Sequence, residues 1–201
     1  MAKPIIAIDL DDVLSDSTES LRQVVNTQYG VSLEPEHYRI PGEYSRYYER
    51  VWEMHGIGNT VSYADLEGQM ISDQSHMPVK FGAVRVLKQL QKHHDLVVLT
   101  ARNPDWEVAT SAWLNIHFPG IFRRVVFGGG RKSVIAKSKG EWCADIGASW
   151  LIDDNPEHCQ TAVKHGITPI LFGEYGWHLR VPMEFQRCRN WEELSEYFEE
   201  H

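Results

Sequence analysis

Four groups of polar residues follow or precede short apolar segments, and their side chains could carry out phosphate chemistry. One segment ends in Asp9-Leu10-Asp11-Asp12 and a later one in Thr100-Ala101-Arg102, while Lys139 precedes a segment that ends in Asp153-Asp154. Taken singly, each group has an ordinary structural explanation, because Asp and Thr cap helices and turns and lysines are commonly solvated. Together they place an acid, a hydroxyl, an ammonium group and an acid pair in order along the chain, and this combination favours a functional site.

The acidic groups predict a binding site for a hard cation. Carboxylates at the ends of two parallel strands would crowd together, and like charges within a few ångströms repel and raise each other's pKa. A divalent cation relieves that repulsion. Because the ligands are oxygens and the histidines show no HExxH or similar spacing, Mg²⁺ is the expected ion.

These residues need a parallel sheet to bring them together. Short apolar runs rich in β-branched residues predict strands over 4–9, 96–100, 124–127, 150–153 and 168–172. Helices are indicated between them. Apolar residues recur at a spacing of three or four in two stretches, Val84, Leu87 and Leu90 and then Trp106, Ala109, Trp113 and Ile116. Pro156 stands at the start of a third helix, and an Asn cap begins a terminal helix over 190–200. The alternation predicts an α/β fold with a doubly wound parallel sheet, whose functional site lies at the carboxyl ends of the strands.

One stretch interrupts the alternation of strands and helices. Residues 32–76 are polar and aromatic and lack a convincing buried strand. We expect them to form a small, mainly helical cap over the sheet, with residues 1–31 and 77–201 forming the α/β core. Within this cap, Tyr44, Tyr48 and Trp52 recur every four residues and would share one helical face.

Composition limits the possible partners. The chain has 201 residues, 42% of them hydrophobic, and a formal net charge of -8, so it can bury one good-sized core and is a poor binder of nucleic-acid polymers. Cys143, Cys159 and Cys188 are odd in number and widely spaced, which indicates free, buried thiols. No secretion signal or membrane span is evident, so we expect a cytoplasmic monomer or homodimer without membrane contact.

The motifs resemble those of the haloacid dehalogenase-like (HAD) phosphatase superfamily, whose signature is a strand-end DxDx[TV], a strand-end Thr, a Lys and an acidic pair. The resemblance spans the whole chain, and the insertion lies where many members carry a helical cap. The details Asp9 to Leu14, Thr100-Ala101-Arg102 and Ile152 to Pro156 are most similar to the 5'(3')-deoxyribonucleotidase group. The resemblance implies a Rossmann-like core and Mg²⁺-dependent hydrolysis of a small phosphate monoester.

The resemblance also implies a role for each residue. Asp9 would be the nucleophile that forms an aspartyl phosphate, and Asp11 the general acid and base. Thr100, the amide of Ala101 and Lys139 would bind the phosphoryl oxygens. Mg²⁺ would be held by the following groups: Asp9, the main-chain oxygen of Asp11, Asp153 and, through water, Asp154.

Several assignments stay open at the level of sequence. Lys139 leads directly into the helix before Asp153, but Lys137 is an alternative phosphate ligand. Asp12 stands where many superfamily members have Gly, and its side chain would either turn to solvent or cap the next helix. The aromatic rings of the insertion would form the core of the cap, or one or two of them would stack on a planar leaving group. Arg102 and the aromatic segment 175–177 are further candidates near the substrate.

The expected substrate is a nucleoside 5'-monophosphate, with a sugar phosphate or another small metabolite as the alternative. A receiver domain also uses an acid pair, Thr, Lys and Mg²⁺, but places its acid pair first, whereas here Asp153-Asp154 comes last. A catalytically silent phosphate-binding protein of the same fold is a third possibility. The run Gly128 to Ser133 lacks the spacing of a P-loop and is interpreted as a flexible loop.

Overall fold

The chain builds a parallel sheet of six strands. The computed structural model describes residues 2–128, 137–178 and 185–201. Within them the sheet order is β3-β2-β1-β4-β5-β6, and each neighbouring pair is parallel. The strands are β1 Ile5–Ile8, β2 Asp95–Thr100, β3 Arg124–Phe127, β4 Ala148–Asp153, β5 Thr168–Phe172 and β6 Gln186–Cys188. The chain therefore winds outward in both directions from β1, and the boundary between β1 and β4 is the point where a doubly wound sheet opens a site.

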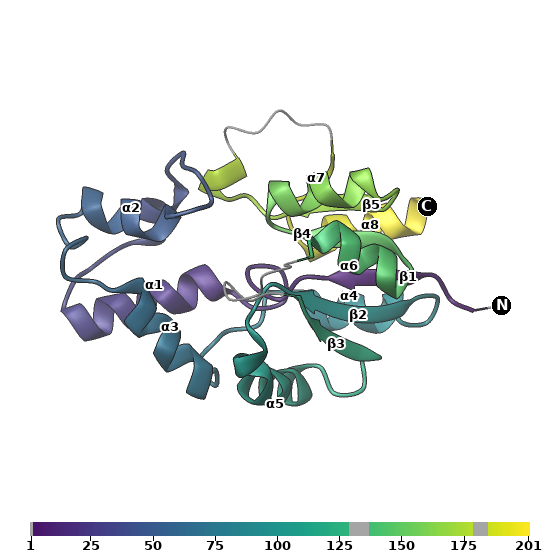
Figure 1. The fold of residues 1–201 in the computed structure, drawn as a ribbon, viewed down its shortest axis with the longest axis horizontal. Coiled ribbons are helices and arrows are strands. Elements are labelled where there is room, and N and C mark those ends of the chain that lie inside the picture. Colours follow the sequence, from purple (N-terminus) through teal and green to yellow (C-terminus); the bar gives the residue numbers. More distant parts are fainter. Residues whose placement is uncertain (1, 129–136, 179–184) are drawn as a thin grey trace.

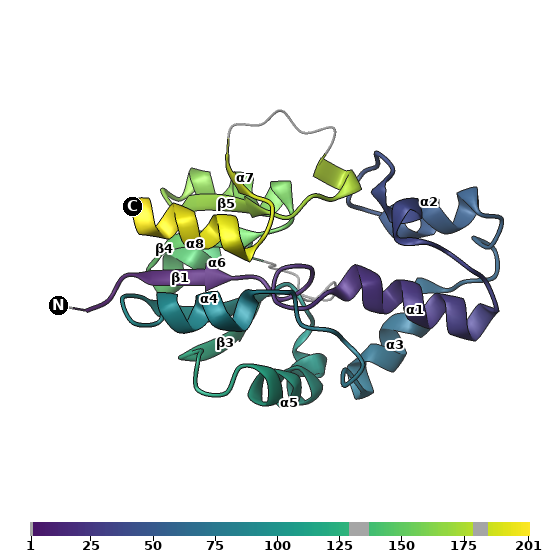
Figure 2. The same ribbon diagram turned by 180° about the vertical axis from the view of Figure 1, so that it is seen from behind.

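Helices cover both faces of this sheet (Figure 1). One face carries α4 Ala83–Leu90, α5 Glu107–His117 and α8 Trp191–Glu200, and the other carries α6 Lys139–Ile146 and α7 Pro156–Lys164. Successive residues of β1 alternate between the two cores, since Ile6 and Ile8 pack on the first face and Ala7 on the second. The view from behind shows α4 and α8 lying along the first face (Figure 2).

Three further helices form a unit beyond the carboxyl ends of the strands. They are α1 Ser17–Tyr29, α2 Tyr47–Met54 and α3 Tyr63–Ser72, with a short 3₁₀ turn at Pro35–Arg39 between the first two. This helical unit has its own apolar cluster, made of Leu21, Val25, Leu33, Tyr38, Tyr47, Val51, Trp52, Val61, Leu66 and Trp177. Residues Leu21 and Val25 of α1 belong to that cluster, although the sequence grouped residues 1–31 with the α/β core. Helix α1 packs its apolar face against α2 and α3 and not against the sheet.

Two linkers join the helical unit to the sheet, and they run side by side. Ser15 forms an antiparallel bridge with Val79. The amide of Asp16 donates to the carbonyl of Pro78 at 2.8 Å, and the amide of Lys80 donates to the carbonyl of Leu14 at 2.9 Å. The outgoing and returning segments thus form a short two-stranded ribbon.

The predicted α/β fold and five of its strands are confirmed, and β6 was missed because it has only three residues and two of them are exposed. Ile116, whose spacing helped to indicate helix α5, lies in that helix but is 70% exposed, because Thr110, Trp113 and Leu114 form its buried face. The three cysteines are buried and free, as expected.

The loop predicted at Gly128 to Ser133 lies, after its first residue, outside the described part of the chain. In the part that is described, no helix combines the length and apolar character needed to cross a bilayer.

Candidate active site

Three adjacent strands deliver the predicted site residues to one edge of the sheet. Thr100 is the last residue of β2, Asp9 follows β1 directly, and Asp153 is the last residue of β4. Because β1 lies between β2 and β4, these side chains become neighbours. All three are buried beneath the helical unit, with exposures of 0% for Thr100, 5% for Asp9 and 0% for Asp153.

Lys139 connects the carboxylates of two strands. Its Nζ lies 2.7 Å from Oδ1 of Asp9 and 2.7 Å from Oδ2 of Asp153. Burial alone would lower the pKa of Lys139, but the two carboxylates outweigh it and hold the pKa above its usual value. Lys137, the alternative, lies on the surface and pairs with Asp145. Of these two lysines, Lys139 is therefore the one placed at the centre.

The start of α6 fixes where Lys139 stands. Ser138 caps the helix through a capping box, in which its hydroxyl accepts from the amide of Glu141 and its own amide donates to the Glu141 carboxylate at 2.7 Å. Gly140 then lets α6 approach α7 closely, because a Cβ at this position would lie 2.2 Å from the carbonyl oxygen of Thr161. The first turn of α6 is thus pressed against α7, with the ammonium group aimed at the strand ends.

Crowded carboxylates give the site an uncompensated negative charge. Burial raises the pKa of Asp9 to about 6, with Lys139 opposing and Asp153 reinforcing the change. The pKa of Asp153 is below its usual value because Lys139 and His158 outweigh the effect of burial. Asp154 has a pKa well above its usual value, owing to burial and to the carboxylates around it.

A divalent cation fits this arrangement. Oδ1 of Asp154 is buried and has no hydrogen-bond partner among the described residues. The donor set is rich in carboxylate oxygens, which hard cations prefer. A cation among Asp9, Asp153 and Asp154 would supply the missing partner and offset the repulsion that raises two of their pKa values.

His158 is a neighbour that the sequence did not reveal. It lies in the first turns of α7, and its Nδ1 is 3.0 Å from Oδ1 of Asp153. Asp9, Asp153 and His158 offer ligand atoms that lie within 4.8 Å of one another. The histidines lack a metal-ligand spacing in the sequence, and the only signal was the position of His158 five residues after the strand-end aspartate.

Asp11 is held by a buried arginine. Nε and Nη2 of Arg102 donate to Oδ2 and Oδ1 of Asp11 at 2.8 and 2.7 Å, and the Ser17 hydroxyl donates to Oδ1 at 2.6 Å. Burial would raise the pKa of Asp11, but Arg102 and Ser17 outweigh it and lower the pKa. Arg102, predicted as a candidate near the substrate, pairs in this structure with the residue predicted as general acid.

Asp12 does not turn to solvent but caps the next helix. It is 3% exposed, and its Oδ1 and Oδ2 accept from the amide and hydroxyl of Thr18 at 3.0 and 2.6 Å in the first turn of α1. Its φ of 56° lies in the left-handed region, which explains why Gly also suits this position. Burial raises the pKa of Asp12.

The aromatic residues of the insertion divide between core and site. Trp52 is fully buried and its Nε1 donates to the hydroxyl of Tyr38, so the cap-core interpretation fits it. The hydroxyl of Tyr48 lies 2.9 Å from Thr18 Oγ1 and 3.5 Å from Asp12 Oδ2, next to the first motif. Tyr44 is 43% exposed, and its pKa is raised by burial of its phenol and by the neighbouring Asp154.

The segment 175–177 joins the helical unit to the sheet. Nε1 of Trp177 donates to the main-chain oxygen of Asp154 at 3.0 Å, and its ring packs edge-on against Tyr44 and Tyr47. The Tyr175 ring stacks on Trp177 with centroids 4.5 Å apart, and its hydroxyl donates to the main-chain oxygen of Asp12. The rings of Tyr175 and Trp177 therefore form structural contacts between the helical unit and the loops that follow the strands.

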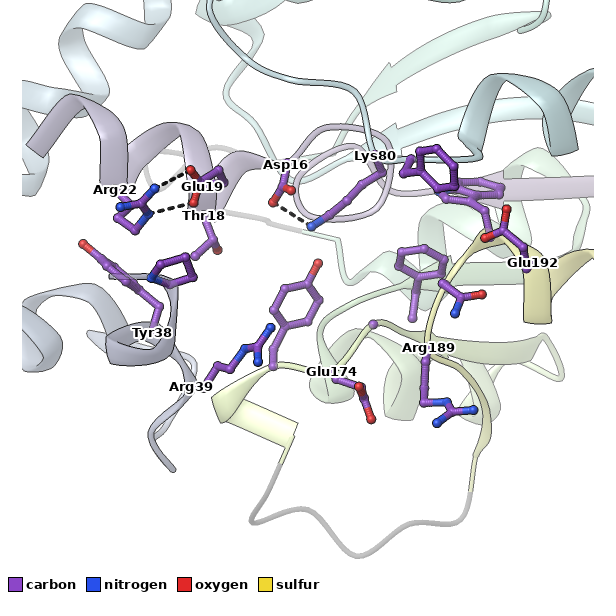
Figure 3. Close-up of a pocket in the computed structure, with 17 residues that line it drawn as sticks. Asp16, Thr18, Glu19, Arg22, Tyr38, Arg39, Lys80, Glu174, Arg189 and Glu192 are labelled. Carbon is purple, nitrogen blue, oxygen red and sulfur yellow. Dashed lines mark hydrogen bonds and ion pairs between the residues drawn. The ribbon is translucent and has the colours of Figure 1, made fainter. Parts of the chain in front are cut away.

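A separate cavity of about 570 Å³ lies beside the site (Figure 3). Tyr175 lines it, but the carboxylates of Asp9, Asp153 and Asp154 do not. Two pairs of its charged groups contact each other, Lys80 with Asp16 at 2.7 Å and Arg22 with Glu19, while Arg39 also lines the cavity. The carboxylates predicted to carry the chemistry lie at the strand ends and do not line this cavity.

Solved structures of haloacid dehalogenase-like (HAD) proteins share the fold of this chain. A haloacid dehalogenase-like protein from Agrobacterium tumefaciens has a TM-score of 0.64 at 15% identity, covering 99% of this chain and 99% of that one. A HAD-superfamily hydrolase from Ehrlichia chaffeensis has a TM-score of 0.59 at 14% identity, covering 100% and 98%. The chain therefore has the fold of HAD-superfamily proteins, with the acid, hydroxyl and acid-pair residues at its strand ends.

The family model of the 5' nucleotidase, deoxy (pyrimidine), cytosolic type C proteins matches residues 3–198, and the chain belongs to this family. It is a phosphoric monoester hydrolase. Proteins named 5'(3')-deoxyribonucleotidase in Bacillus subtilis strain 168 and in Bacillus phage SPbeta are each 30% identical over 197 residues, covering 96% of this chain and 97% of the relative. The resemblance predicted from the motifs is confirmed.

Proposed function

We propose that this chain hydrolyses deoxyribonucleoside and ribonucleoside 5'-monophosphates with Mg²⁺, through an aspartyl phosphate on Asp9. The observation that carries the proposal is Lys139, whose ammonium group lies 2.7 Å from both Asp9 and Asp153 at adjacent strand ends. Membership of a 5' nucleotidase family and the two relatives named deoxyribonucleotidases support the substrate class.

The first half of the reaction uses Asp9 and Asp11. A carboxylate oxygen of Asp9 attacks phosphorus, and the bond from phosphorus to the ester oxygen breaks. The protonated form of Asp11, which its lowered pKa makes the minor form, gives its proton to that oxygen. Lys139, the Thr100 hydroxyl and the amide of Ala101 hold the phosphoryl oxygens during this transfer, where positioning and charge stabilisation supply most of the rate.

The second half regenerates the enzyme. Asp11, now ionised, takes a proton from water as the water oxygen attacks phosphorus. The bond between phosphorus and the Asp9 carboxylate breaks, and phosphate is released. The same carboxyl group thus serves as acid and then as base.

A bound Mg²⁺ would be held by Asp9, the main-chain oxygen of Asp11, Asp153 and Asp154. When bound, it offsets negative charge between the nucleophile and the substrate. The unpartnered Oδ1 of Asp154 is the observation that supports this assignment.

The helical unit formed by α1, α2 and α3 is proposed to act as the cap. It covers the strand ends, and the phenols of Tyr44 and Tyr48 lie near the carboxylates beneath it. We propose these two rings as the contacts for the leaving nucleoside, since aromatic faces stack on bases.

A panel of phosphate esters tests the proposal. Wild type and Asp9→Asn are assayed for phosphate release from dUMP, dTMP, UMP and several sugar phosphates, with Mg²⁺ and with excess EDTA. The proposal expects Mg²⁺-dependent release, highest on the nucleotides, and none by Asp9→Asn. Preference for sugar phosphates would overturn the substrate class. Equal release by both proteins would overturn the nucleophile, and no turnover of any ester would identify a silent binding protein.

A further inference from the structure

Arg102 is buried and contacts residues from three segments of the chain. Besides Asp11, its Nη1 donates to Oε1 of Gln74 at 2.6 Å and to Oγ1 of Thr110 at 3.0 Å, and its guanidinium carbon lies 5.0 Å from the centre of the Trp106 ring. A buried guanidinium with these partners has a defined position and orientation.

The two partners of the ion pair differ in exposure. The side chain of Arg102 is 4% exposed, while that of Asp11 is 34% exposed. Arg102 therefore stands behind Asp11, and Asp11 is the member of the pair that a ligand can reach. A direct contact from Arg102 to substrate would require it to leave its buried partners.

Gln74 connects this pair to the helical unit. It is 2% exposed and lies in the segment that returns from α3 to the sheet. Ser17, which also donates to Asp11, is the first residue of α1. The carboxylate expected to transfer protons is thus bonded, directly or through Arg102, to both connections of the helical unit.

We infer that Arg102 is the positioning residue of the general acid. Because Gln74 holds Arg102, the position of Asp11 also depends on where the helical unit lies. This inference rests on the proposed function of Asp11. The bidentate pair fixes the rotamer of Asp11, so that proton transfer to the leaving oxygen starts from one defined geometry. Lysine cannot reproduce the two parallel hydrogen bonds.

The test compares two substrates that differ in their need for an acid. A nucleoside monophosphate has an alkoxide leaving group that must be protonated, whereas p-nitrophenyl phosphate releases a stable phenolate. The measured quantity is kcat/KM, because it reports the steps up to departure of the leaving group. The later hydrolysis of the aspartyl phosphate does not affect it. Because the ratio of the two values is taken on one preparation, it does not depend on the fraction of folded protein.

General acid catalysis contributes roughly 10²- to 10⁴-fold, so Arg102→Lys should lower kcat/KM for the nucleotide at least ~10-fold more than for the aryl ester. In an Asp11→Asn background, the same substitution should change the nucleotide rate by less than ~2-fold, because it acts through the group already removed. Gln74→Met should show a smaller loss with the same selectivity, and it carries the test if Arg102→Lys does not fold. Arg22→Lys, at a pair with Glu19 outside the site, is the matched control and should leave the ratio unchanged.

Three results for Arg102→Lys would overturn the inference. These are an equal loss of kcat/KM on both substrates, a loss on the nucleotide that adds to that of Asp11→Asn, or a rise in kcat/KM for the nucleotide. The third result would mean that the pair restrains Asp11 from acting. A wild-type protein that is inactive on both esters, or whose activity survives Asp9→Asn, would instead show that the proposed function itself is wrong.

Discussion

Replacing Asp154 by Asn should stabilise the metal-free protein while weakening its response to Mg²⁺. Asp154 is 2% exposed, its Oδ1 has no hydrogen-bond partner among the described residues, and its pKa is raised by burial and by neighbouring carboxylates. The substitution keeps the shape of the side chain and removes the charge. In the absence of a cation, this carboxylate therefore opposes folding.

The size of the effect follows from the cost of an unpaired buried group. An unsatisfied buried polar group costs about 1–3 kcal/mol, and more when charged, so Asp154→Asn should raise the free energy of unfolding by about 1–3 kcal/mol at neutral pH. For a protein of this size, 1 kcal/mol corresponds to about 2–4 °C in Tm. We expect the Tm in excess EDTA to rise by about 2–12 °C.

Thermal unfolding with and without Mg²⁺ measures both parts of the prediction. A ligand that binds the folded state at 100 times its Kd adds about 2.7 kcal/mol, and this increment should shrink in Asp154→Asn because one ligand group is weakened. Asp145→Asn, at an exposed carboxylate paired with Lys137, is the control and should change stability by less than about 0.5 kcal/mol. A lower Tm in EDTA, or an unchanged Mg²⁺ increment, would refute the reasoning.

Three further substitutions test other parts of the structure. Lys139→Met leaves two buried carboxylates without their cation, so it should destabilise the protein by about 3–5 kcal/mol in thermal unfolding and reduce kcat at least ~10²-fold, whereas surface Lys137→Met should do neither. Burial lowers the pKa of His178 from 6.5 to about 4. Between pH 6.5 and pH 4 the unfolded chain therefore binds a proton at this residue that the folded protein does not bind. The free energy of unfolding should fall by up to about 3 kcal/mol as the pH drops through this range. Urea unfolding at several pH values should show a shallower loss in His178→Asn, and equal slopes would contradict this assignment. Gly140→Ala should cost about 1–3 kcal/mol in urea unfolding because its Cβ would meet a backbone carbonyl at 2.2 Å, whereas Gly68→Ala, with nothing within 4 Å, should be neutral or stabilising by about 0.5–1 kcal/mol.

The strand ends of the site were predictable because their pattern is local. Apolar runs end directly at Asp9, Thr100 and Asp153, and parallel strands gather such ends at one edge. The choice of Lys139 also follows from local sequence, since Ser138 and Glu141 form the capping box that starts its helix. The structure places the predicted charged groups together for these reasons.

The partners of these residues were not predictable, because they depend on contacts between distant parts of the chain. Asp11 and Arg102 are separated by 91 positions, and nothing in either motif indicates that they pair. The packing of α1 against α2 and α3 similarly depends on which apolar faces meet in space. Strand β6 has too few residues to leave a periodic signal.

The hydrogen-bonded ribbon that joins the helical unit to the sheet limits how that unit can move. Two antiparallel segments that share the bonds at Ser15, Asp16 and Lys80 bend together across their common plane but resist sliding past each other. Any motion of the helices relative to the strands would therefore take the form of a hinge-like rotation. Such a rotation would keep the ribbon intact, so little conformational entropy would be lost each time the helical unit returned to the strand ends.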